Sequence, residues 1–212
     1  MNSMTTNTAW LQRLGAVPDA ITAAVFLSLW MAPLWLGPRA VSNALLTMLV
    51  EFVLVHAAGM LGGLLESRAH SRRAQVVALL GFGLLYAAFI AAFALAFGEW
   101  WPVVVFAWLL LGKVQDLFST SPADPQHRQQ RQAMWALQVV AYLAAVFATV
   151  LLPIPRLGLT EAIQPQLGLT GSGLWVEQPQ TVVVAGALYF GILAWVKWRA
   201  WAGSVRQQPA QR

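Results

Sequence analysis

The chain has 212 residues, of which 58% are hydrophobic and only 10% are charged, and its mean hydropathy is +0.62. Charged side chains make up about a quarter of an ordinary soluble domain, so this composition excludes that class and indicates a chain that lies mostly in lipid. The formal net charge is +5, but the 13 Lys and Arg are scattered between apolar runs and form no basic stripe, so we expect a lipid bilayer and no nucleic acid as partner.

Six apolar runs of about membrane length follow one another along the chain. They predict an all-α fold, a bundle of six transmembrane helices that forms a single integral membrane domain over residues 1–212. The expected spans are residues 19–36, 41–65, 74–97, 100–117, 133–152 and 181–198. Asp19 is placed to cap the first span, and Pro33 to kink or end it. A cleaved signal peptide is the competing interpretation of this run, but its long apolar core and single preceding arginine favour a retained span.

The connections between the spans differ in length and composition. Gly98 and Glu99 predict a tight hairpin that makes the third and fourth spans antiparallel neighbours. Residues 119–132 lack apolar side chains and are expected to form a solvated loop. Residues 153–180 are expected to form a long outer loop across the mouth of the bundle, and residues 199–212 a cytoplasmic tail.

The basic residues are distributed unevenly between the two sides of a six-span arrangement. With a cytoplasmic N-terminus, eleven of the 13 Lys and Arg lie inside and two, Arg39 and Arg156, lie outside. Because cytoplasmic loops carry the excess of basic residues, both termini are predicted to be inside (N-in/C-in).

Tryptophans gather near the ends of the spans. Amphipathic rings prefer the headgroup level of a bilayer, so an interfacial anchor is favoured over a ligand-binding aromatic box. The expected anchors are Trp100, Trp101, Trp175, Trp195, Trp198 and Trp201.

The second span carries the two most deeply placed ionisable residues, Glu51 and His56. A carboxyl group in hydrocarbon is costly and marks a candidate polar site. In a regular helix the two residues lie about 140° apart around the axis, so their side chains do not face each other. One interpretation is a proton-relay or coupling site. The favoured one is two neutral groups that each hydrogen-bond to a neighbouring helix and fix its packing.

The same span offers small residues in helical register. Gly59 and Gly63 form a GxxxG motif, and Ala58 and Gly62 form a parallel pair. Such residues permit close approach of another helix, which we expect to come first from this chain and second from a homo-oligomer.

Lys113 and Asp116 are spaced i, i+3 at the predicted inner end of the fourth span. A helix end with a surface ion pair is favoured over a site that positions an anionic substrate.

An early span with one Glu, followed by an apolar span that ends in Lys113, Asp116 and Leu117, resembles a group of uncharacterised bacterial multi-pass membrane proteins classed as a domain of unknown function. The resemblance covers residues 40–120 and implies a bacterial inner-membrane setting, but no activity. The long outer loop departs from the pattern of that group.

The chain lacks the residue patterns of the common catalytic and metal sites. It has no Cys, and its three histidines, His56, His70 and His127, fall on different elements. No HExxH, P-loop or GxSxG motif occurs, so we expect no metal, cofactor or catalytic residue.

The favoured function is a non-enzymatic accessory, assembly or scaffold component of a membrane, acting as a homo-oligomer or with a membrane-protein partner. The alternative is a small proton-coupled transporter or permease with Glu51 as the protonatable group.

Overall fold

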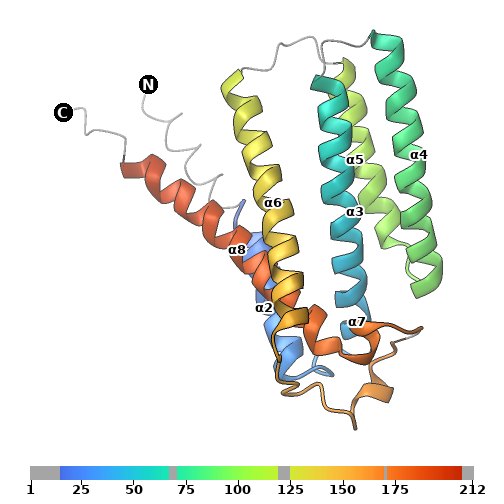
Figure 1. The fold of residues 1–212 in the computed structure, drawn as a ribbon, viewed down its shortest axis with the longest axis vertical. Coiled ribbons are helices and arrows are strands. Elements are labelled where there is room, and N and C mark those ends of the chain that lie inside the picture. The colour runs from blue at the N-terminus through green and yellow to red at the C-terminus, as the bar shows by residue number, and fades with distance from the viewer. Residues whose placement is uncertain (1–14, 67–70, 119–124, 170, 207–212) are drawn as a thin grey trace. The chain divides into compact units, whose positions relative to one another are not determined.

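The computed structural model describes residues 15–66, 71–118, 125–169 and 171–206, and every regular element in these ranges is a helix. The elements are α2 (Val17–Met31), α3 (Ala40–Glu66), α4 (Arg72–Phe97), α5 (Trp101–Phe118), α6 (Pro125–Leu151), the 3₁₀ helix η1 (Gln164–Gln166), α7 (Leu174–Glu177) and α8 (Pro179–Arg206) (Figure 1). The all-helical fold expected from the sequence is confirmed for this part of the chain.

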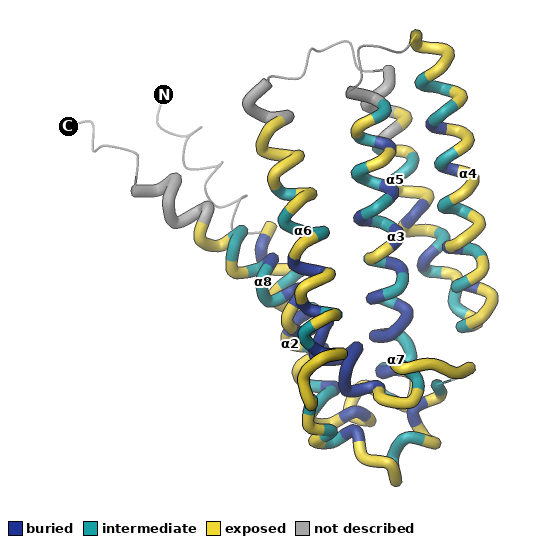
Figure 2. The backbone as a smooth tube through the Cα atoms, viewed as in Figure 1, coloured by how far each residue is buried: buried dark blue, intermediate teal, exposed yellow. Residues whose placement is uncertain are grey.

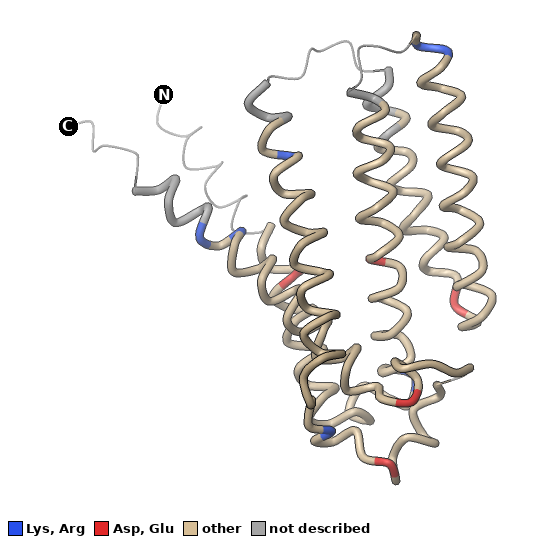
Figure 3. The backbone as a smooth tube through the Cα atoms, viewed as in Figure 1, with Lys and Arg blue, Asp and Glu red and all other residues tan. Residues whose placement is uncertain are grey.

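Four of the described helices are long and apolar enough to span a membrane. The segments are Ala40–Leu64, Arg72–Phe97, Gln129–Leu151 and Pro179–Arg199. Two further apolar segments are shorter: α2 (Val17–Met31) and the stretch Trp101–Gly112 within α5. Figure 3 shows how few charged residues lie between the ends of these helices. The length and composition of the helices are consistent with the integral membrane protein that the sequence predicts.

Helix α2 ends earlier than expected. It stops at Met31, whereas the first span was expected to reach residue 36. The cause is Pro33, because the residue before a proline avoids helical angles, and Ala32 has a φ of −139° and a ψ of 75°. The chain then turns through Gly37, which has a φ of +96°, into α3.

The expected solvated loop over residues 119–132 is wrong in its second half. Residues 119–124 lie outside the described ranges, but α6 begins at Pro125. Proline is tolerated in the first helical turn, and the Gln and Arg residues that follow are good helix formers although they are polar. The lack of apolar residues here does not indicate a loop, because residues 125–132 belong to α6.

The structure divides into two compact units. One comprises residues 45–140, and the other comprises residues 1–44 together with residues 141–212. The division falls within α3 and α6, so each of these helices contributes to both units.

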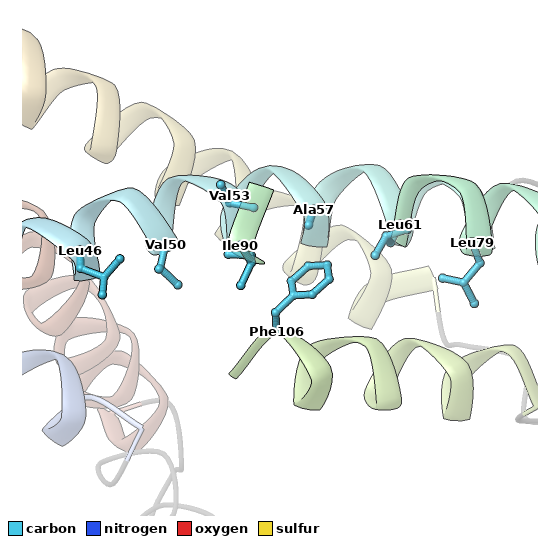
Figure 4. Close-up of a cluster of buried hydrophobic side chains, with 8 residues drawn as sticks. All are labelled: Leu46, Val50, Val53, Ala57, Leu61, Leu79, Ile90 and Phe106. Carbon is cyan, nitrogen blue, oxygen red and sulfur yellow. The ribbon is translucent and has the colours of Figure 1, made fainter. Parts of the chain in front are cut away.

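The unit of residues 45–140 packs α3, α4 and α5 around one apolar cluster. Its buried side chains are Leu46, Val50, Val53, Ala57 and Leu61 on α3, Leu79 and Ile90 on α4, and Phe106 on α5 (Figure 4). The α3 members recur every three or four residues, which places them on one face of the helix. Gly98, with a φ of +67°, ends α4, and the chain returns at once into α5, as the tight hairpin predicts.

The other unit is organised around the first half of α8, where every residue from Pro179 to Ala187 is buried (Figure 2). Helix α2 packs against α8, and the Phe26 ring occupies the place where a Cβ at Gly186 would lie. The Phe26 ring also contacts Phe190, with ring centroids 5.7 Å apart. Since Asp19 at the start of α2 pairs with Lys197 far along α8, the two helices run antiparallel.

The connection from α6 to α8 is folded against the end of α2. The Trp30 indole donates to the Pro155 carbonyl over 2.8 Å, and the Gly158 amide donates to the Trp30 carbonyl over 3.1 Å. Gly158 lies so close to the Met31 carbonyl that a side chain there would overlap it. The connection thereby satisfies a carbonyl that the end of α2 leaves without a partner in its own helix.

Candidate functional site

The polar candidates of α3 point in different directions. His56 Nδ1 lies 2.8 Å from the Phe52 carbonyl oxygen; because a carbonyl only accepts, Nδ1 carries the proton. The His56 ring also contacts the Phe52 ring, with centroids 4.2 Å apart and planes tilted by 44°. Phe52 is exposed, so this pair occupies an outward face of α3. The hydrogen bond of His56 is therefore made within its own helix.

Glu51 lies elsewhere on α3. Its side chain is half-buried, and the regular helix places it about 140° from His56 around the axis. The separation that the sequence predicts between the two residues is thus present in the helix. A carboxyl group at this position, within a membrane-length segment, remains the most costly ionisable group in α3 to place in lipid.

The glycine motif of α3 contacts α6 at one position. The Trp135 indole lies where a Cβ at Gly59 would be, and its Nε1 donates to the Val55 carbonyl over 2.9 Å. In an α-helix this carbonyl faces the amide of residue 59, so the missing side chain opens it to the indole. A Cβ at Gly63 would meet nothing within 4 Å. Ala58 and Gly62 are half-buried on the same helix.

An ion pair that the sequence did not predict joins α2 to α8. Lys197 Nζ lies 2.5 Å from Asp19 Oδ2, and the two side chains are 30% and 14% exposed. The expected cap is wrong, because α2 begins at Val17 without a side-chain cap and Asp19 lies in its first turn, where a negative charge is also favourable. One signal could have identified the pair: two opposite charges lie at the same predicted side of the first and last spans.

The expected tryptophan anchors occupy several environments. Trp100, Trp195 and Trp198 are exposed, and Trp101 and Trp175 are half-buried. The Arg199 guanidinium lies over the Trp195 ring, 4.2 Å from its centroid. The Trp201 side chain lies outside the described part of the structure.

The second charged candidate cannot be placed in the same detail. The backbone of Lys113 and Asp116 belongs to α5, but their side chains lie outside the described part of the chain. Among the described residues, no group of three His, Cys, Asp or Glu is arranged to hold a metal ion. One buried polar atom in these ranges, Gln180 Oε1 near the start of α8, has no hydrogen-bond partner, and no sequence signal indicated it.

Comparison with known proteins adds no further assignment. No protein family matches the chain, and no curated protein or solved structure matches it. The resemblance of residues 40–120 to uncharacterised bacterial membrane proteins therefore stays a prediction.

Proposed function

We propose that this chain is a six-span protein of a bacterial inner membrane with both termini on the cytoplasmic side. The pairing of the shorter helices supports this topology. Helix α2 runs antiparallel to α8, and α5 returns along α4, where a Cβ at Gly83 would meet the Leu110 side chain. Since α8 and α4 each contain a membrane-length segment, we expect their antiparallel neighbours to cross as well.

The lengths of the two shorter helices are close to what a crossing needs. Helix α5 has 18 residues and is about 27 Å long, and α2 has 15 residues and is about 22 Å long. The hydrocarbon layer is about 30 Å thick. For α2, the folded connection at Trp30 and Gly158 adds protein at the end where the helix falls short.

The role that we propose is a non-enzymatic accessory or scaffold component that works through helix packing. One observation carries this proposal: three of the polar and small residues that could serve chemistry are engaged in contacts within the chain. Asp19 pairs with Lys197, His56 bonds to its own helix, and Gly59 accommodates Trp135. Each of these contacts fixes how helices are held, and none presents a reactive group to a substrate.

A second candidate function rests on Glu51. This carboxyl is half-buried in the middle of a membrane-length helix, and an acid at such a place is a common feature of proton-coupled transport. In that case the chain is a small permease that couples a substrate to protonation of Glu51.

Proton flux separates the two functions. The purified chain is reconstituted in liposomes that contain a pH-sensitive dye, and an inward pH gradient is applied. The scaffold role predicts that wild type, Glu51→Gln and the control Glu161→Gln all match protein-free liposomes. Flux above that level that falls selectively in Glu51→Gln would establish the transporter instead.

A second measurement addresses assembly directly. When mild detergent solubilises the membrane, a scaffold component is expected in a particle whose protein mass exceeds that of one 23.1 kDa chain. Native gel electrophoresis of solubilised membranes, with a cross-linker to capture weak contacts, measures this size. A chain that is monomeric under both conditions contradicts the scaffold role.

A further inference from the structure

Among the described side chains of α8, Arg199 is a cation that faces outward near the end of the apolar run. Trp195 and Arg199 are spaced i, i+4, which puts them on the same face of the helix. The guanidinium lies 4.2 Å from the centroid of the indole ring, Trp195 is 54% exposed, and Arg199 is exposed too. The aromatic ring thus holds the charged group in a defined position at the surface.

Lys197 belongs to the opposite face. It lies about 200° around the axis from Trp195, and its ammonium group pairs with Asp19 of α2. Its charge is therefore balanced within the protein. Of the two cations at this level of α8, Arg199 is the one whose charge faces outward.

The position of Arg199 along α8 matches the membrane surface. The apolar run of α8 gives way to charged residues at Lys197 and Arg199, and Trp is enriched at the interface between hydrocarbon and water. Phosphate groups of lipids lie at that level. The Arg199 side chain is exposed, and the N–H donors of a guanidinium suit the oxygens of a phosphate.

From these contacts we propose that Trp195 and Arg199 form a binding site for the phosphate of an anionic phospholipid. The outward charge favours a headgroup with net negative charge over a zwitterionic one, whose own cation is repelled. The inference rests on the proposed placement of α8 across a membrane and is independent of the scaffold role.

The test measures lipid binding to the full-length chain by native mass spectrometry from a neutral detergent, with phosphatidylglycerol and phosphatidylcholine as probes. Wild type is expected to retain phosphatidylglycerol in preference. Arg199→Gln should weaken that binding at least about fivefold, since one basic residue near an anionic surface contributes about 1 kcal/mol. Trp195→Leu, which removes the stacking surface, should weaken it in the same direction.

Matched controls keep the result specific. Arg156→Gln removes a cation that is already paired with Glu161 over 3.0 Å and should leave lipid binding unchanged. Arg199→Gln should also unfold at nearly the same temperature as wild type in phosphatidylcholine, because Arg199 is exposed and its contact among the described residues is the one with the Trp195 ring.

Two outcomes would overturn the proposal. In the first, Arg199→Gln binds phosphatidylglycerol as well as wild type does. In the second, inorganic phosphate displaces the lipid at equal concentration, which would indicate a site for free phosphate. The proposed placement of α8 across a membrane is tested separately, by extraction of membranes with alkaline carbonate. A chain that carbonate releases is not an integral membrane protein, and this result would remove the basis of the lipid site.

Discussion

At the scale of single residues, Gly59 and Gly63 show what a motif can and cannot predict. The sequence places both on one GxxxG face and predicts close approach there. In the structure only the first of these two lies against another helix, through the Trp135 indole that bonds to the Val55 carbonyl. The motif gives no information on where a partner helix crosses, because that depends on side chains remote in sequence.

Substitution of these two glycines provides a matched pair. Gly59→Ala should lower the free energy of unfolding by about 1–3 kcal/mol, since the new methyl group displaces the Trp135 ring and breaks its hydrogen bond. Gly63→Ala should be neutral or stabilise by up to about 1 kcal/mol, because alanine is the better helix former and meets open space. Titration with SDS in mixed micelles measures both. Equal effects of the two substitutions would contradict the Trp135 contact.

At the scale of helices, the antiparallel packing of α2 on α8 depends on one close approach. Phe26 is buried, contacts the Phe190 ring and fills the space beside Gly186. The sequence predicts both helices from their apolar runs, and Pro33 correctly marks where α2 must end. It does not predict this pairing, because Gly186 carries no motif and the two helices are remote in the chain.

Gly186→Ala should therefore destabilise the protein by about 3 kcal/mol, because the new methyl group would overlap the Phe26 ring, which is buried and must shift within its packing. Gly191→Ala on the same helix is the control. A Cβ at Gly191 meets nothing within 4 Å, so this change should stabilise α8 by up to about 1 kcal/mol. Denaturant titration with near-UV circular dichroism reports both values. If Gly186→Ala is as stable as Gly191→Ala, α2 does not pack here.

The Asp19–Lys197 ion pair joins the same two helices near their other ends. Asp19→Asn or Lys197→Gln alone should cost about 1–3 kcal/mol, because each leaves the remaining charge without its partner in a mostly buried place. The double variant should cost less than the sum of the two. The coupling free energy from this double-mutant cycle is the measurement, and a value of zero would mean that the pair contributes nothing to stability.

At the scale of the whole molecule, composition alone predicts an all-helical chain with helices suited to a membrane, because lipid allows few other structures. The division into two units leaves no signal in the sequence, since it falls inside α3 and α6. The sequence also predicts a loop where α6 begins, because the first turns of this helix are polar and carry no apolar pattern. The single integral domain and the six-span N-in/C-in topology stay predictions.

The number of membrane crossings can be tested most directly by labelling single cysteines on either side of the membrane. The chain has no Cys, so Ser71→Cys and Ser172→Cys can each be labelled with a membrane-impermeant maleimide in intact cells. Both positions are exposed. Six spans predict that residue 172 is labelled from outside and residue 71 only after permeabilisation. If only the four membrane-length helices cross, the two residues lie on the same side, and identical labelling would contradict the account.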